Sequence, residues 1–166
     1  MLEVSDTSLS SGAKVNAVAA AAGLRKLLLA LSGKVDLKAA WGALMPGLQA
    51  GQVVGIKINV LNRRVPTHPE VVKALVDLLK EGAGLSSGQI LVWDRRLDEL
   101  TKAGFTAQSM GAMVEGTWDD TVAKGTGRGY ELSSTCIGGQ NTHLSNIMTR
   151  RVDHLINLAV MKRHDL

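Results

Sequence analysis

The stretch VVGIKINV, residues 53–60, decides the fold of this chain. It is dense in β-branched residues and long enough for a buried strand. Alternation along such a strand puts Lys57 and Asn59 on one face and Ile56 and Ile58 on the other. We therefore expect a central strand whose polar pair lies at its carboxyl end.

The next segment, THPE at residues 67–70, has the pattern of a helix start. Thr67 is the predicted N-cap, and Glu70, three residues later, completes a capping box. An apolar stripe at helical spacing follows and lasts until the glycines at 82 and 84. The pattern predicts a helix that crosses back over the sheet.

Further strands and helices alternate along the chain. Residues 89–94 predict a second buried strand, and residues 97–103 a short helix. A helix that starts at Thr142 or Ser145 precedes a third apolar run at residues 154–160. Short strands that are apolar on both faces and joined by helices indicate parallel pairing with right-handed crossovers.

The expected fold class is α/β, a Rossmann-like open sheet that is mostly parallel, with helices on both faces. We expect one domain over residues 1–166, incomplete at its C-terminus because no helix follows the last strand. Its parts are N-terminal helices (1–50), a strand-helix-strand-helix unit (51–104), a Gly-rich irregular segment in which one edge strand is expected (105–141), and a helix with the last strand (142–166).

Composition narrows the class of protein. The 166 residues carry a net charge of +4, are 45% apolar and only 3% aromatic, which predicts a core of aliphatic side chains. The positive charges are scattered, so nucleic acid is not an expected partner. The longest apolar stretch, 15–31, contains charges and is shorter than the ~20 residues of a membrane span. The expected compartment is the cytoplasm, with an exported mature chain as the alternative.

Several short motifs favour an ordinary structural interpretation. GLSSG, residues 84–88, has the spacing of a serine-hydrolase elbow, but it precedes a strand instead of following one. GTGRG, residues 125–129, lacks the spacing of a phosphate-binding loop. The four histidines show no metal-ligand spacing, and Cys136, the single cysteine, cannot hold an iron–sulfur cluster by itself. No metal or cofactor is assigned from the sequence.

Polar residues follow all three predicted strands. If the strands are parallel, these residues meet at one edge of the sheet, where ligands bind in open α/β folds. Such an edge could bind a carboxylate or phosphate through its lysines and move a proton through a histidine or aspartate. Charged strand ends are also how buried strands return to solvent, so the structural alternative stays open. The residues are Lys57, Asn59, Asp94, Arg95, Arg96, Lys162 and His164.

The order of these blocks resembles the uncharacterised DUF family 362. The resemblance runs from about residue 39 to the C-terminus and rests on VVGIKIN (53–59), THPEVV (67–72), ILVWDRR (90–96), THLS (142–145) and LINLAVMK (155–162). Some members of that family are joined to ferredoxin-type iron–sulfur domains. The resemblance therefore implies redox chemistry with an iron–sulfur partner, and ligand-binding roles for Lys57, Asn59, Asp94, Lys162 and His164.

Two functions follow as expectations. The first is a domain that binds or transforms a small anionic molecule at the carboxyl edge of the sheet; neither the substrate nor the reaction class is assigned. The alternative is a non-catalytic or truncated domain that serves self-assembly or partner interaction. In either case we expect a homo-oligomer, because the last strand would otherwise expose an apolar face.

Overall fold

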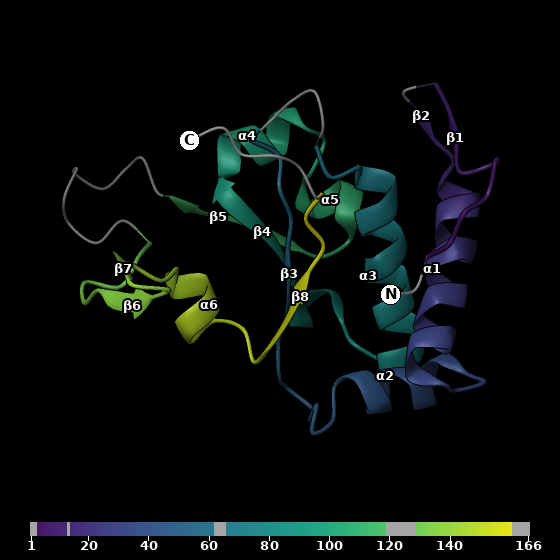
Figure 1. Cartoon of the computed structure of the whole chain (residues 1–166), viewed down its shortest axis with the longest axis horizontal. Helices are drawn as coiled ribbons and strands as arrows, with labels where there is room; N and C mark the ends of the chain where they lie inside the picture. The colour runs from purple at the N-terminus through teal and green to yellow at the C-terminus, as the bar shows by residue number, and fades with distance from the viewer. Residues whose placement is uncertain (1–2, 13, 62–65, 119–128, 161–166) are drawn as a thin grey trace.

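The computed structural model describes residues 3–12, 14–61, 66–118 and 129–160 (Figure 1). Its centre is a sheet of four parallel strands in the order β5-β4-β3-β8. Their bounds are Val54–Lys57 for β3, Ile90–Arg96 for β4, Met113–Trp118 for β5 and His154–Asn157 for β8. The predicted parallel pairing of the three apolar runs is confirmed, and β5 is the edge strand expected in the Gly-rich segment.

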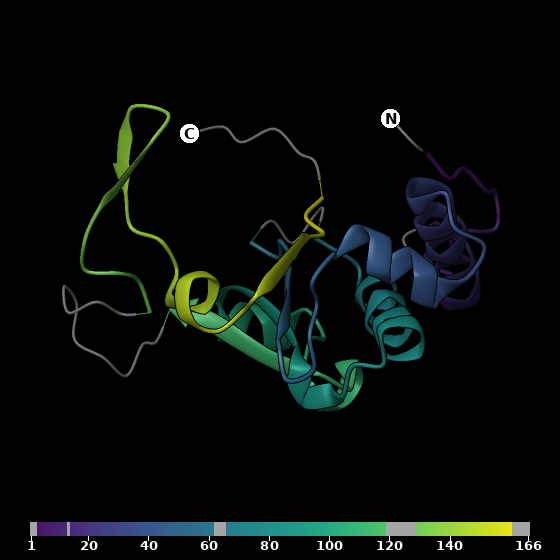
Figure 2. The same ribbon diagram turned by 90° about the horizontal axis from the view of Figure 1, so that it is seen from below.

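One face of the sheet carries the main core. Helix α3 (Pro69–Ala83) and helix α2 (Leu37–Leu44) lie against it, and Val54, Ile56 and Ile58 are fully buried there. Helix α1 (Ala17–Ser32) packs on the outside of these two helices, farther from the sheet (Figure 2). Helices α2 and α3 are joined to each other, because the Trp41 indole of α2 donates a hydrogen bond of 2.9 Å to the backbone oxygen of Leu78 in α3.

The opposite face has a smaller cover. Helix α6 (Asn146–Arg150) places Ile147 on Leu91 and Trp93, and the turn after it brings Val152 onto β3. At Gly55 a Cβ would lie 2.7 Å from Cγ1 of Val152, so glycine is needed for this close approach. The prediction of helices on both faces is confirmed, although Leu155 of β8 stays exposed to solvent.

The remaining elements are short. They are the hairpin β1–β2 (Ser10–Ser11, Lys14–Val15), a 3-10 turn at Ser87–Gln89, α4 (Leu97–Lys102), α5 (Ala107–Met110) and the hairpin β6–β7 (Thr135–Ile137, Gln140–Thr142). Hairpin β6–β7 projects from the body in both views (Figures 1 and 2). No helix in the described part of the chain is long and apolar enough to cross a bilayer.

The predicted cap of α3 is wrong. His68 is the N-cap residue and makes no side-chain capping bond. The Thr67 hydroxyl is used elsewhere: it accepts from the Asn59 backbone N–H at 3.1 Å and lies 3.3 Å from the backbone oxygens of Asn59 and Leu158. Thr67 therefore joins the chain after β3 to the chain after β8 instead of capping the helix. The loop interpretation of residues 84–88 is confirmed, since Ser86 caps the turn that leads into β4.

Candidate ligand-binding site at the carboxyl edge of the sheet

Lys57 and Asp94, both predicted site residues, form an ion pair across β3 and β4. The Lys57 ammonium lies 2.6 Å from Oδ1 of Asp94, and the side chains are 30% and 9% exposed. Lys57 is the last residue of β3 and also donates to the Ile58 backbone oxygen. The two residues meet because parallel strands end at one edge of the sheet.

Asp94 also fixes the backbone around it. Its Oδ2 accepts from the Val60 N–H at 2.8 Å, and its Oδ1 accepts from the Arg95 N–H at 2.7 Å. With Lys57, three donors therefore converge on one buried carboxylate, which holds the chain after β3 against β4. This arrangement makes Asp94 an organiser of the edge, since three of the roughly four lone-pair sites of its carboxylate are engaged by the protein.

Asn59 is held by its backbone and leaves its side chain for another partner. Its N–H donates to the Thr67 hydroxyl, and its C=O accepts from the Thr67 N–H at 2.9 Å. Its Oδ1 is buried with no hydrogen-bond partner among the residues described. A buried acceptor of this kind needs a water, an ion or a ligand to satisfy it.

Aromatic side chains accompany the cations at this edge. The Lys57 ammonium lies 5.3 Å from the centre of the Trp93 ring, and the Arg95 guanidinium carbon lies 5.4 Å from the centre of the Trp118 ring. Both distances are within the range of cation–π attraction. Trp93 is 5% exposed, and its Nε1–H has no hydrogen-bond partner among the described residues.

Tyr130 joins this group from outside the parallel strands. Burial raises the pKa of Tyr130 above its usual value; the nearby charge of Arg95 lowers it and that of Asp94 raises it. Its backbone forms a bridge with Ser145, whose hydroxyl is 2.9 Å from that of Thr117 at the end of β5. The tyrosine is thus anchored to the carboxyl edge and stays protonated at neutral pH.

The structure brings together only part of the predicted site. Lys57, Asn59 and Asp94 lie at the carboxyl edge as expected, whereas Lys162 and His164 lie outside the described residues. Sequence reasoning missed Trp118 and Tyr130. The sequence does contain a signal for Trp118 and Tyr130. The chain has only three Trp, one Tyr and one Phe, so each aromatic residue that a core of aliphatic side chains does not need is a candidate site residue. Among the described residues no group of three or more His, Cys, Asp and Glu gathers as a metal site would require.

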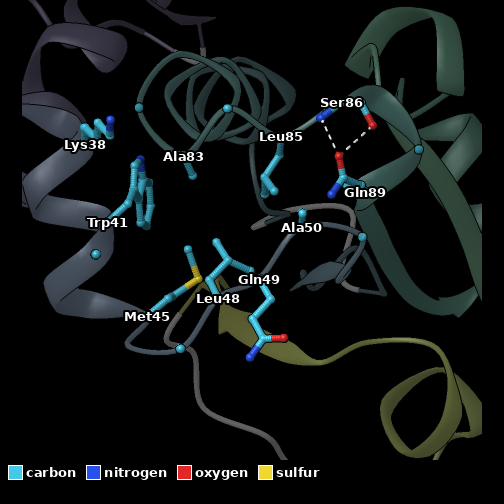
Figure 3. Close-up of a pocket in the computed structure, with 16 residues that line it drawn as sticks. Lys38, Trp41, Met45, Leu48, Gln49, Ala50, Ala83, Leu85, Ser86 and Gln89 are labelled. Atoms are coloured by element: carbon cyan, nitrogen blue, oxygen red, sulfur yellow. Dashed lines mark hydrogen bonds between the residues drawn. The ribbon is translucent and has the colours of Figure 1, made fainter.

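A cavity of about 710 Å³ lies at the other end of the sheet, next to the amino ends of β3 and β4. The side chains of Trp41, Met45, Leu48 and Leu85 surround it (Figure 3), and Lys38 is the charged residue in its lining. Its polar lining also includes Gln49, Ser86 and Gln89, and the last two hydrogen-bond to each other. The carboxyl edge is the stronger candidate, because there an exposed guanidinium and a buried unpaired acceptor can orient a ligand.

A second cavity of about 710 Å³ adjoins the carboxyl edge. We call it the Trp118 cavity. It lies between α4 and β5 and is lined by Leu97, Asp98, Thr101, Lys102, Glu115, Gly116 and Trp118. Gly116 permits this arrangement, since a Cβ there would lie 2.4 Å from the backbone nitrogen of Leu97.

Comparison with known proteins identifies the family. The family described as Domain of unknown function (DUF362) matches residues 54–166, about two thirds of the chain. Neither the curated proteins nor the solved structures gave a match. The matched range begins later than residue 39, but it contains the whole parallel sheet and all five predicted site residues. The chain therefore belongs to the DUF362 family.

Proposed function

We propose that this domain binds a small anionic molecule at the carboxyl edge of its parallel sheet. The observation that carries the proposal is the state of Arg95. Its side chain is exposed, and no carboxylate of the described residues lies within ion-pair distance of its guanidinium. A guanidinium presents a planar fork of donors that suits carboxylate and phosphate groups.

The surroundings of Arg95 support this role. Lys57 and Asp94 neutralise each other, so the positive charge of Arg95 is not balanced by that pair. The backbone N–H of Arg95 donates a hydrogen bond to Asp94, which fixes the backbone from which the Arg95 side chain extends. A positioned cation costs less entropy to engage than a free surface arginine, which favours binding of an anion there.

A thermal-shift screen of carboxylates, phosphates and nucleotides tests the proposal, with wild type compared to Arg95→Met. Methionine keeps an unbranched stem and removes the charge. A ligand at ten times its Kd should stabilise wild type by about 1.4 kcal/mol, or about 3–6 °C in Tm. Lys57 is a less suitable target, because its loss would also remove a donor to buried Asp94.

Lys38→Met supplies the matched control, since it removes one cation at the opposite end of the sheet. We expect Arg95→Met to lose most of the ligand response and Lys38→Met to keep it. Equal responses of wild type and Arg95→Met to every anion would refute the proposal.

A second candidate function, self-assembly through β8, rests on a separate observation. In the described part of the chain β8 pairs on one side only, with β3, and Leu155 is 48% exposed. Residues 155–160 carry no charge that would discourage strand pairing. Such an edge favours contact with a second copy of the chain or with another protein.

Sedimentation velocity at micromolar concentration tests this second candidate. Assembly through β8 predicts a dimer in wild type and a monomer in Leu155→Lys, because the lysine puts like charges at the contact. A wild-type monomer would rule it out. The redox chemistry with an iron–sulfur partner and the cytoplasmic location stay predictions of the sequence.

A further inference from the structure

We infer that the anion bound at this edge is planar and conjugated, with its ring in the Trp118 cavity and its charged group on Arg95. The inference rests on the proposed function and adds the class of ligand to it. Carboxylates or phosphates attached to an aromatic or heteroaromatic ring have this chemistry.

The distribution of aromatic residues is the first support. The chain has five aromatic side chains, and three of them, Trp93, Trp118 and Tyr130, gather at the carboxyl edge. Trp93 is buried beneath α6, whereas Trp118 and Tyr130 are half-buried and keep accessible surface. An aromatic surface beside an exposed guanidinium binds flat π systems in preference to saturated groups.

The lining of the Trp118 cavity is the second support. Leu97 is 48% exposed and, with Trp118, gives the cavity apolar surface. Its charged groups are already paired: Lys102 bonds Asp98 at 3.0 Å, and hydrogen bonds from Arg96 and Lys102 lower the pKa of Asp98 to about 2. The cavity therefore suits an uncharged ring, while Arg95 beside it suits the anionic substituent.

Unsatisfied polar atoms at the same edge are the third support. Asn59 Oδ1 and Trp93 Nε1, neither of which belongs to the lining of the Trp118 cavity, are buried without partners among the described residues, so the neighbouring part of the edge has an acceptor and a donor to satisfy. The Tyr130 hydroxyl, whose pKa burial raises above its usual value, is protonated at neutral pH and able to donate. Such groups give a ligand orientation as well as affinity.

Isothermal titration with two matched dianions tests the inference. Terephthalate and trans-1,4-cyclohexanedicarboxylate have the same charges, but only the first is aromatic. We expect wild type to bind terephthalate about five-fold more tightly, since aromatic contacts contribute affinity beyond buried area. Trp118→Leu should reduce that preference to less than two-fold, whereas Lys38→Met should leave it unchanged.

The outcomes separate the inference from the function on which it rests. Equal affinities in wild type would overturn the planar ligand and leave anion binding intact, whereas no binding of either dianion, together with an empty anion screen, would overturn both. If Trp118→Leu keeps the wild-type preference for terephthalate, the ring of the ligand does not bind in the Trp118 cavity. If that variant does not fold, the wild-type NMR spectrum decides: the ring current of terephthalate should shift the Trp118 indole signal at least twice as far as the saturated dianion does. Equal shifts with both would overturn the inference.

Discussion

Replacing Asp94 by Asn should destabilise the fold far more than the same change at the surface. The Asp94 carboxylate accepts from Lys57, Val60 and Arg95 at 2.6–2.8 Å. An asparagine oxygen can keep two of these donors, but the amide NH₂ then faces the third. One buried donor without an acceptor costs about 1–3 kcal/mol, and the two remaining hydrogen bonds lose the negative charge of their acceptor.

The expected loss is about 2–4 kcal/mol. This range is about 1 kcal/mol lower than the 3–5 kcal/mol typical of a broken buried pair, because Lys57 is 30% exposed and water can solvate its charge. For a domain of this size the loss corresponds to a fall of about 5–15 °C in Tm. Urea unfolding followed by circular dichroism, together with thermal melts, gives both quantities.

Asp77→Asn is the matched control. Asp77 pairs with Lys73 on the surface of α3, where its side chain is 54% exposed. We expect a change within about 0.5 kcal/mol there. If Asp94→Asn is as stable as Asp77→Asn, the three hydrogen bonds do not organise the edge, and the reasoning fails.

Three further predictions concern single residues. Gly116→Ala should cost about 1–3 kcal/mol in urea unfolding, because its Cβ would meet the backbone of Leu97 at 2.4 Å; a stability equal to wild type would contradict the close approach. Tyr130, the single tyrosine, should ionise above pH 10 in the folded chain and near pH 10 in urea. Arg95→Met should raise the pKa of Tyr130 in the folded chain further, because the nearby charge of Arg95 lowers it. Absorbance at the phenolate band measures this pKa, and a value at or below 10 in the folded chain would be inconsistent with the burial of the ring. Glu131, with a pKa lowered to about 2 by hydrogen bonds from an arginine and a threonine of α6, should hold the base of hairpin β6–β7 above pH 4.5 and release it as the pH falls towards 2. The protection factors of the hairpin amides, taken against exchange of the unfolded chain at the same pH, should fall over that window and stay constant near neutral pH.

The parallel sheet could be predicted because its strands are specified by local sequence. Residues 53–60, 89–94 and 154–160 are short apolar runs with helices between them, and that pattern admits few topologies. The limits of β3 and β8 were less predictable. Strands β3 and β8 both end before the apolar runs that contain them, since Thr67 joins the chain segments that follow the two strands.

The candidate site was predictable only where strand ends define it. Lys57, Asn59 and Asp94 follow from the rule that parallel strands end at one edge. Tyr130 could not be placed, because its position depends on a bridge to Ser145 and on the packing of α6. The cap at Thr67 was misassigned for a related reason: its hydroxyl finds partners far along the chain, which no local pattern shows.

The indole N–H signals of the three tryptophans test the location of the anion site most directly. Trp41 lines the cavity at the amino ends of the strands, Trp118 lines the cavity at the carboxyl edge, and Trp93 lies beside Lys57. In a ¹H–¹⁵N spectrum titrated with inorganic phosphate and then with terephthalate, anion binding at the carboxyl edge predicts saturable shifts of the Trp118 indole and the Arg95 side-chain N–H, with Trp41 unmoved. Shifts confined to Trp41, or none at all with either anion, would contradict it.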